Sequence, residues 1–209
     1  WGTLLVLCGI VVLSFSQCTL GVGMKEANYP IEATRFIQQN RLPANLYNAY
    51  DWGGYLMWEL YPDYLVYIDG RSTSSKIFRD SITIENAQPG WEAVLSDYNL
   101  KTIITRTCFF DTGGPLLLID ALAKSPEWAL VYSDEIAVVY VRRSEVTPEF
   151  LGEYTLPWQN AFQTMFAEAS RLFAEDATRK RALLALGRSA VKLGQYTEAL
   201  DFYGRYLEY

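Results

Sequence analysis

The sequence contains no histidine, and this absence excludes several kinds of active site. Ser-His-Asp and Cys-His nucleophilic sites both depend on a histidine as general base. Common zinc sites need four ligands, and the chain offers only three cysteines. It also lacks the GxGxxG and GxxxxGK motifs that cradle nucleotide phosphates. We therefore predict no metal and no cofactor.

Basic residues are also scarce, with 18 Lys and Arg against 24 Asp and Glu and a formal net charge of −6. A nucleic-acid-binding protein usually carries a basic patch. The composition therefore predicts that nucleic acid is not a partner. Because half of the residues are hydrophobic, the chain is also unlike a disordered one.

Charge is absent altogether from residues 1–24, and the first charged side chain is Lys25. About 20 mostly apolar residues suffice to span a bilayer as a helix. A secretory signal peptide would need a basic start and a small-residue cleavage site, which this run lacks. We predict a transmembrane helix over residues 1–23 (domain 1–24), the last of a longer chain, with a buried core helix as the alternative.

Residues 25–146 alternate short helical and strand patterns, which predicts an α/β domain. The apolar run 64–68 and the segment 102–105 are typical of strands buried on both faces. Two further strands, over 128–132 and 136–141, are predicted to form a hairpin. We expect a mostly parallel sheet with this antiparallel hairpin at its edge.

Residues 147–209 contain helix formers and no strand pattern. The segment 182–209 resembles a tetratricopeptide repeat, a unit of two antiparallel helices. The matching residues are Leu186, Gly187, Gly194, Tyr196, Ala199 and Tyr203. The resemblance predicts a helical hairpin that binds a protein partner, and an ordinary helical hairpin is the alternative.

Two short stretches carry the candidate ligand-binding residues. Asp51 and Trp52 follow the predicted strand 46–49, and Asp69 and Arg71 follow the predicted strand 64–68. Ligands of open α/β sheets gather at the carboxyl ends of strands. We predict that Asp51, Trp52, Asp69 and Arg71 form one substrate-binding cluster, with a structural ion pair between Asp69 and Arg71 as the alternative.

Residues 28–143 resemble a domain found in bacterial multi-pass GT-C-type glycosyltransferases, which are similar to protein O-mannosyltransferases. Three motifs carry the resemblance: N-x-Y-x-x-G-G-Y-L-x-W from Asn48, I-D-G-R from Ile68, and W-x-x-V-Y-x-D-x-x-A-V-V-Y-V from Trp128. In that family the domain is extracytoplasmic and closes the chain. The family's catalytic acidic residues lie in early loops, upstream of this segment.

The resemblance implies a non-catalytic, C-terminal part of a glycosyltransferase that uses a lipid-linked sugar, with no catalytic residue in this chain. It also implies localisation in a membrane with a periplasmic α/β domain. The expected partners are the lipid bilayer and a lipid-linked sugar or its acceptor. The alternative is a membrane-anchored scaffold that binds a protein partner through the tetratricopeptide-like helices.

Overall fold

The computed structural model describes residues 28–71 and 74–209. The first part of the chain contains α2 (Ile31–Gln39), β1 (Leu46–Asn48), the 3-10 turn η2 (Tyr50–Trp52), α3 (Gly53–Leu60), α4 (Ser75–Glu85), α5 (Trp91–Asp97), β2 (Thr102–Thr105), α6 (Leu117–Lys124), β3 (Trp128–Ser133) and β4 (Val138–Arg142). The second part contains η3 (Arg143–Glu145), α7 (Pro148–Tyr154), α8 (Gln159–Glu175), α9 (Ala182–Lys192) and α10 (Tyr196–Leu207).

The four strands form a mixed sheet in the order β1-β2-β4-β3. Only β1 and β2 run parallel, since β4 is antiparallel to both β2 and β3. The prediction of a mostly parallel sheet is therefore wrong. The hairpin β3–β4 is present, but its second strand pairs with β2, which makes two of the three strand pairings antiparallel.

The apolar run 64–68 does not form the predicted central strand, and the side chain of Asn48 explains why. Its Oδ1 accepts hydrogen bonds from the backbone N–H groups of Tyr67 and Ile68 at 2.9 and 3.3 Å. Its Nδ2 donates to the Ile68 carbonyl at 2.8 Å. These backbone groups are satisfied by one buried side chain, and a single isolated bridge, from Leu46 to Val66, is all that remains of the expected strand pairing.

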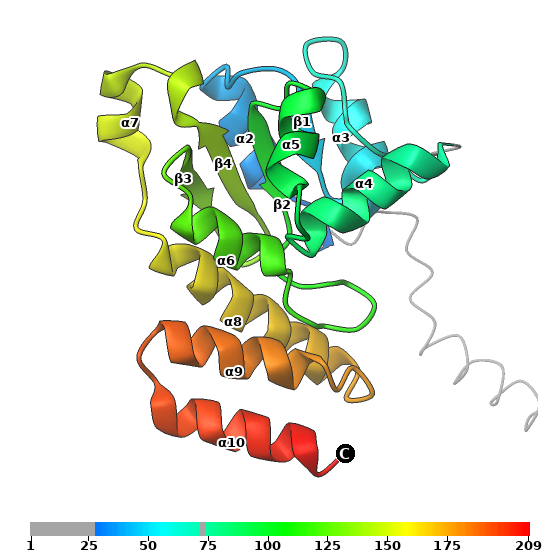
Figure 1. Cartoon of the computed structure of the whole chain (residues 1–209), viewed down its shortest axis with the longest axis vertical. Coiled ribbons are helices and arrows are strands. Elements are labelled where there is room, and N and C mark those ends of the chain that lie inside the picture. Colours follow the sequence, from blue (N-terminus) through cyan, green and yellow to red (C-terminus); the bar gives the residue numbers. More distant parts are fainter. Residues whose placement is uncertain (1–27, 72–73) are drawn as a thin grey trace, which may run out of the picture.

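Helices cover both faces of the sheet (Figure 1). On one face, α2 and α3 pack Ile37, Leu56 and neighbouring side chains against β1 and β4. On the other face, α4, α5 and α6 bury Ile84, Leu95 and Ile119 against the sheet. Successive strand residues point to opposite faces, so each strand contributes to both cores.

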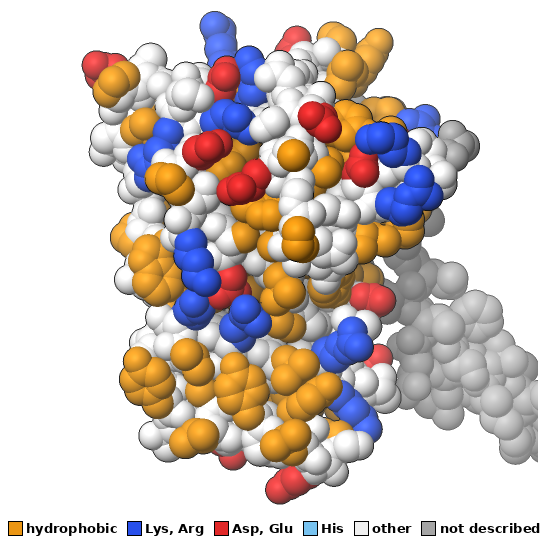
Figure 2. All heavy atoms as spheres, in the orientation of Figure 1, with side chains coloured by type: hydrophobic (Ala, Val, Ile, Leu, Met, Phe, Trp, Pro, Cys, Tyr) orange, Lys and Arg blue, Asp and Glu red, His pale blue; other side chains and the backbone are white. Residues whose placement is uncertain are grey.

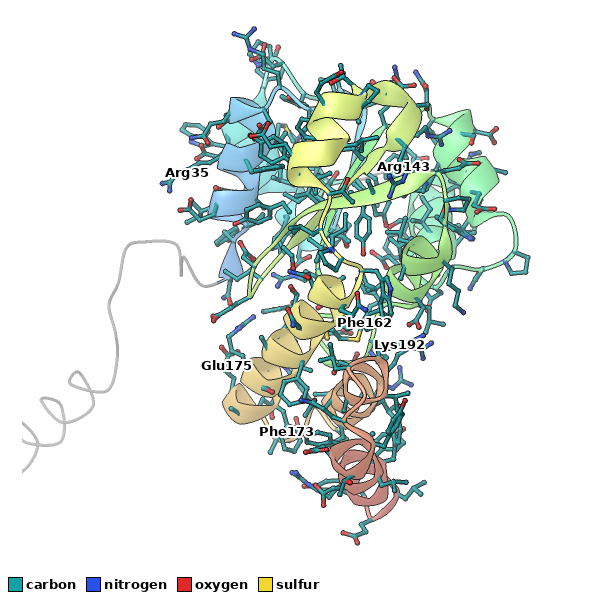
Figure 3. The ribbon with its side chains drawn as sticks, turned by 90° about the vertical axis from the view of Figure 1, so that its left-hand side faces the viewer. Arg35, Arg143, Phe162, Phe173, Glu175 and Lys192 are labelled. Atoms are coloured by element: carbon teal, nitrogen blue, oxygen red, sulfur yellow. The ribbon has the colours of Figure 1, made fainter. Side chains whose placement is uncertain are left out.

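The core on the face covered by α4, α5 and α6 continues into helices α8 and α9. Tyr140 of the sheet belongs to the same buried cluster as Phe162 and Met165 of α8 and Leu183 of α9. Phe162 lies where the α/β part meets α8 and α9, and the Nζ of Lys192 is 5.6 Å from the centre of its ring (Figure 3). Helices α8–α10 therefore share a core with the sheet.

Helices α9 and α10 form the helical hairpin predicted over 182–209. A methyl group added at Gly187 would lie 2.6 Å from the Tyr203 ring, so the two helices approach closely at this point. Gly194 has a φ of +78° in the turn between the helices, a conformation that glycine adopts readily. Two of the residues that match the repeat, Gly187 and Tyr203, thus lie at the contact between the two helices.

No helix in residues 28–71 and 74–209 is long and apolar enough to cross a membrane. This finding contradicts the predicted localisation in a membrane with a periplasmic domain. The transmembrane helix predicted over residues 1–23 lies outside the described residues.

Candidate functional site

A pocket of about 290 Å³ opens beside the carboxyl ends of the parallel strands β1 and β2. This is the edge of an α/β sheet at which ligands commonly bind. The pocket is lined by Ala49, Tyr50, Asp51, Phe78, Ser81, Ile82, Glu85, Arg106, Cys108, Phe109, Phe110, Asp111 and Leu116. Aromatic and aliphatic walls with a few charged groups are typical of small-molecule sites.

Asp51 is held at the pocket by an ion pair with a residue distant in sequence. Directly after β1, the turn η2 brings Asp51 toward the end of β2, where Arg106 follows Thr105. The Nε of Arg106 donates to Asp51 Oδ2 at 2.7 Å. The guanidinium also stacks 4.6 Å from the Trp52 ring centre and 4.9 Å from that of Phe110, which are cation–π distances.

Glu168 of α8 binds the same guanidinium from the helical segment. Its Oε1 accepts from Arg106 Nη1 at 3.2 Å, and its Oε2 accepts from the Thr107 N–H, the Thr107 hydroxyl and the Cys108 N–H at 2.9, 2.7 and 3.1 Å. Glu168 is fully buried, and this burial raises the pKa of its carboxyl, although Arg106 and the Thr107 donors oppose that shift. The ionised carboxylate is the form that accepts all four hydrogen bonds.

Glu85 of α4 is the most perturbed acid of the pocket. Burial raises the pKa of its carboxyl to about 7, and the negative charges of Asp51 and Asp111 add to the shift. A hydrogen bond from Ser81 acts in the opposite direction. Within the described residues Glu85 has no ion-pair partner, because the salt bridges there do not involve it. A carboxyl with a pKa near neutrality in a pocket is a common mark of a functional site.

No hydrogen bond or ion pair joins Asp51 or Trp52 to Asp69 or Arg71, although the backbone of Asp69 packs against Gly53 beside them. Asp69 and Arg71 pair with each other, with Arg71 Nε 3.0 Å from Asp69 Oδ1, and this bonding lowers the pKa of the Asp69 carboxyl. Asp51 pairs with Arg106 instead. Trp52 is completely buried and donates through Nε1 to the Asn28 carbonyl at 2.9 Å, so its ring does not stack on a ligand.

Sequence reasoning missed Arg106, Glu85 and Glu168, although two of them leave a signal. Arg106 directly follows a buried strand, as Asp51 and Asp69 were expected to do. Glu168 is a charged residue on the buried face that Met165 and Leu172 define in α8. Glu85 was missed because α4 was not predicted, despite Ser74 as a helix N-cap that accepts from the Ile77 N–H.

Within residues 28–71 and 74–209, no group of three or more His, Cys, Asp or Glu side chains could hold a metal ion. Comparison with known proteins gives no match to a family model, a curated protein or a solved structure. The resemblance to the glycosyltransferase domain thus stays a prediction, and the site is interpreted from its own chemistry.

Proposed function

We propose that residues 28–146 form a non-catalytic sugar-binding module of a glycosyltransferase that uses a lipid-linked sugar. The observation that carries the proposal is the pocket at the carboxyl ends of β1 and β2, where aromatic rings lie beside carboxyl groups. Carboxylate oxygens accept hydrogen bonds from sugar hydroxyls, and aromatic rings such as Tyr50 and Phe78 pack against the apolar face of a sugar ring.

Two features favour binding over catalysis. Asp51 is engaged with Arg106 at 2.7 Å, so its carboxyl group is already held in an ion pair. Cys108 is fully buried, and burial raises the pKa of its thiol well above the ordinary value, so no reactive thiolate forms. The pocket therefore has groups that can hold a sugar and lacks an activated nucleophile among its lining residues.

The experiment is a saturation-transfer NMR screen of mono- and disaccharides against the full chain. Ile82, an exposed residue at the mouth of the pocket, is replaced in Ile82→Trp to obstruct entry. Ser75→Trp places the same bulk on α4 away from the pocket. We expect sugar signals from the wild type and Ser75→Trp, their loss in Ile82→Trp, and no chemical change in the sugar. Sugar signals that persist unchanged in Ile82→Trp, or turnover of the sugar, would contradict the proposal.

A second candidate function is partner binding by the helical segment. Figure 2 shows hydrophobic side chains gathered over α9 and α10. On α10, Tyr196, Leu200 and Leu207 are 66%, 74% and 83% exposed, which is unusual for large apolar side chains on a helix that already buries Ala199 against its neighbour. Peptides selected from a displayed library should lose binding to Leu200→Asp and keep it to Thr197→Asp. Equal binding to both variants would count against this function.

A further inference from the structure

The lining of the pocket carries more negative than positive charge, and its cation, Arg106, is already bonded to other groups. Its Nε, Nη1 and Nη2 donate to Asp51, Glu168 and the Asn28 carbonyl at 2.7, 3.2 and 3.0 Å. Two carboxylates thus surround the one cation that lines the pocket, and all of its nitrogen atoms are engaged. Three of its five N–H donors are used in this way, and its side chain is only 4% exposed, so it offers little cationic surface to an anionic ligand such as a phosphate.

Glu85 and Asp111 add acidity that no described cation offsets. Both line the pocket, and neither forms an ion pair within the described residues. Glu85 is faced by Asp51 from η2, by Asp111 from the loop before α6 and by Ser81 from its own helix. Arg106 is the one cation in this lining, and it is already shared between two carboxylates. The pocket consequently favours a positively charged group.

A buried hydroxyl lies next to the lining residues Ser81 and Glu85, but its residue, Tyr47, does not itself line the pocket. Tyr47 of β1 is fully buried, and its ring extends toward Ser81 and Glu85, both of which line the pocket. Its hydroxyl makes no hydrogen bond within the described residues, and neither does that of Thr105. Tyr47 is paired with Ile103 across the strands, so Thr105, two residues further along β2, lies on the same face of the sheet.

The hydroxyls of Tyr47 and Thr105 do not line the pocket, so its lining residues determine which ligand groups fit. The carboxylates of Glu85 and Asp111, which do line it, are hydrogen-bond acceptors. The acceptors of the pocket therefore outnumber its free donors. A ligand group with several N–H donors and a positive charge complements this arrangement.

We infer that the pocket binds a small molecule that carries a protonated amino group, and that an amino sugar is the ligand of this class that suits the proposed function. This inference rests on the proposed sugar-binding function and narrows its ligand. An ammonium group offers three donors and one positive charge. The aromatic rings of Tyr50 and Phe78 at the mouth add a cation–π surface, and they lie 6.1 Å apart at 81°.

The test compares matched cationic and neutral probes on the full chain by calorimetry. Glucosamine is compared with glucose near neutral pH, and cyclohexylammonium with cyclohexanol at about pH 8 and about pH 5.5. We expect each cationic probe to bind at least about tenfold more tightly than its neutral match, as for one added charge-assisted interaction of about 1.4 kcal/mol. The preference for cyclohexylammonium should shrink at the lower pH, where Glu85 is protonated.

Glu85→Gln keeps the shape of the side chain and removes its charge, so it should abolish most of the cation preference. Glu92→Gln, an exposed acid on the adjacent helix α5, is the matched control and should keep the preference. Binding of cyclohexylammonium without glucosamine would assign the site to simple amines and overturn the amino-sugar assignment. Equal binding of glucose and glucosamine, blocked by Ile82→Trp, would overturn the inference and leave the sugar-binding function standing. Absence of binding by any probe would contradict both.

Discussion

Two Asp–Arg pairs of similar geometry lie in very different surroundings. Arg106 Nε is 2.7 Å from Asp51, and Arg71 Nε is 3.0 Å from Asp69. The side chain of Arg106 is only 4% exposed and is also bound by Glu168, whereas that of Arg71 is 75% exposed. Distance alone therefore does not rank the two pairs, because solvent screens the charge of Arg71 far more than that of Arg106.

The comparison also separates local from long-range contacts. Asp69 and Arg71 are two residues apart, and their bonds hold one turn in place. Arg106 joins η2, the end of β2 and α8, which come from distant parts of the sequence. The cluster of Asp51, Arg106 and Glu168, in which Arg106 and Glu168 are buried, thus connects the pocket to the helical segment, and the pair of Asp69 and Arg71 does not.

The largest effect is expected from Glu168→Ala. Removing one partner of a buried ion pair leaves the remaining charge and the Thr107 donors without their acceptor, which typically costs about 3–5 kcal/mol. Chemical denaturation of the full chain measures this loss of unfolding free energy. Glu175→Ala, which removes a half-exposed acid at the end of the same helix, is the control and should change stability far less. Equal losses in both variants would contradict the difference drawn between buried and exposed pairs.

Gly53→Ala should give the next largest loss, near the upper end of the usual 1–3 kcal/mol for overpacking. An added methyl group would lie 2.2 Å from the Ile68 carbonyl oxygen and 2.6 Å from Asp69 Cα, and backbone atoms yield little. Gly54→Ala is a matched control, because nothing lies within 4 Å of its added methyl group. Thermal unfolding should show a lower midpoint for Gly53→Ala and an unchanged or higher midpoint for Gly54→Ala. A reversed order would mean that the turn 68–71 does not pack on α3.

Glu85 predicts a pH dependence of stability whose sign follows from its raised pKa. The folded carboxyl keeps its proton up to about pH 7, whereas in the unfolded chain it ionises near its ordinary value of about 4.3. Between these values the folded state binds more protons, so its stability falls as the pH rises. At about 1.4 kcal/mol for each pKa unit, the loss is at most about 4 kcal/mol.

Glu85→Gln removes the titrating carboxyl. The difference in stability between the wild type and this variant therefore measures the contribution of Glu85 to the pH dependence. Relative to the wild type, the variant should gain stability between about pH 5 and about pH 8, as measured by denaturant unfolding at each pH. Asp97→Asn, an exposed acid on α5, should show no such trend. A stability difference that does not change with pH would show that Glu85 has an ordinary environment.

The smallest effect is expected from Arg71→Ala. The pair with Asp69 is exposed and screened by solvent, so its removal should leave the thermal midpoint nearly unchanged. Calorimetric titration with glucosamine should also be unaffected, because Arg71 does not line the pocket. Loss of binding at unchanged stability would place Arg71 at a ligand site after all.

Local patterns in the sequence predicted many of the elements but not the sheet or the site. The strand 102–105 and the hairpin of α9 and α10 follow from short-range residue patterns, and both are present. The pairing of β4 with β2 depends on contacts between distant segments. The run 64–68 has the composition of a strand, but its backbone is bound by the Asn48 side chain, which no periodicity reveals.

The sequence predicted that the candidate site lies at the end of a strand, and it identified one residue of the site, Asp51. Asp69 and Arg71 were expected to reach Asp51, but their nearest partners are each other, since two residues joined by one glycine pair more easily than distant ones. Arg106 and Glu168 meet across 62 positions of sequence, and the partner of a charge at that separation is set by packing. The helix α4, which supplies Glu85, was not predicted at all.

A carbon-13 NMR titration of the Glu85 carboxyl in the full chain tests the central claim most directly. The resonance can be assigned by its loss in Glu85→Gln. The account predicts a midpoint of about 7, because the half-buried carboxyl lies near Asp51 and Asp111 and has no ion-pair partner among the described residues. A midpoint near the ordinary glutamate value of about 4.3 would mean that the carboxyl is solvated or paired, and would contradict the account of an acidic ligand pocket at the ends of β1 and β2.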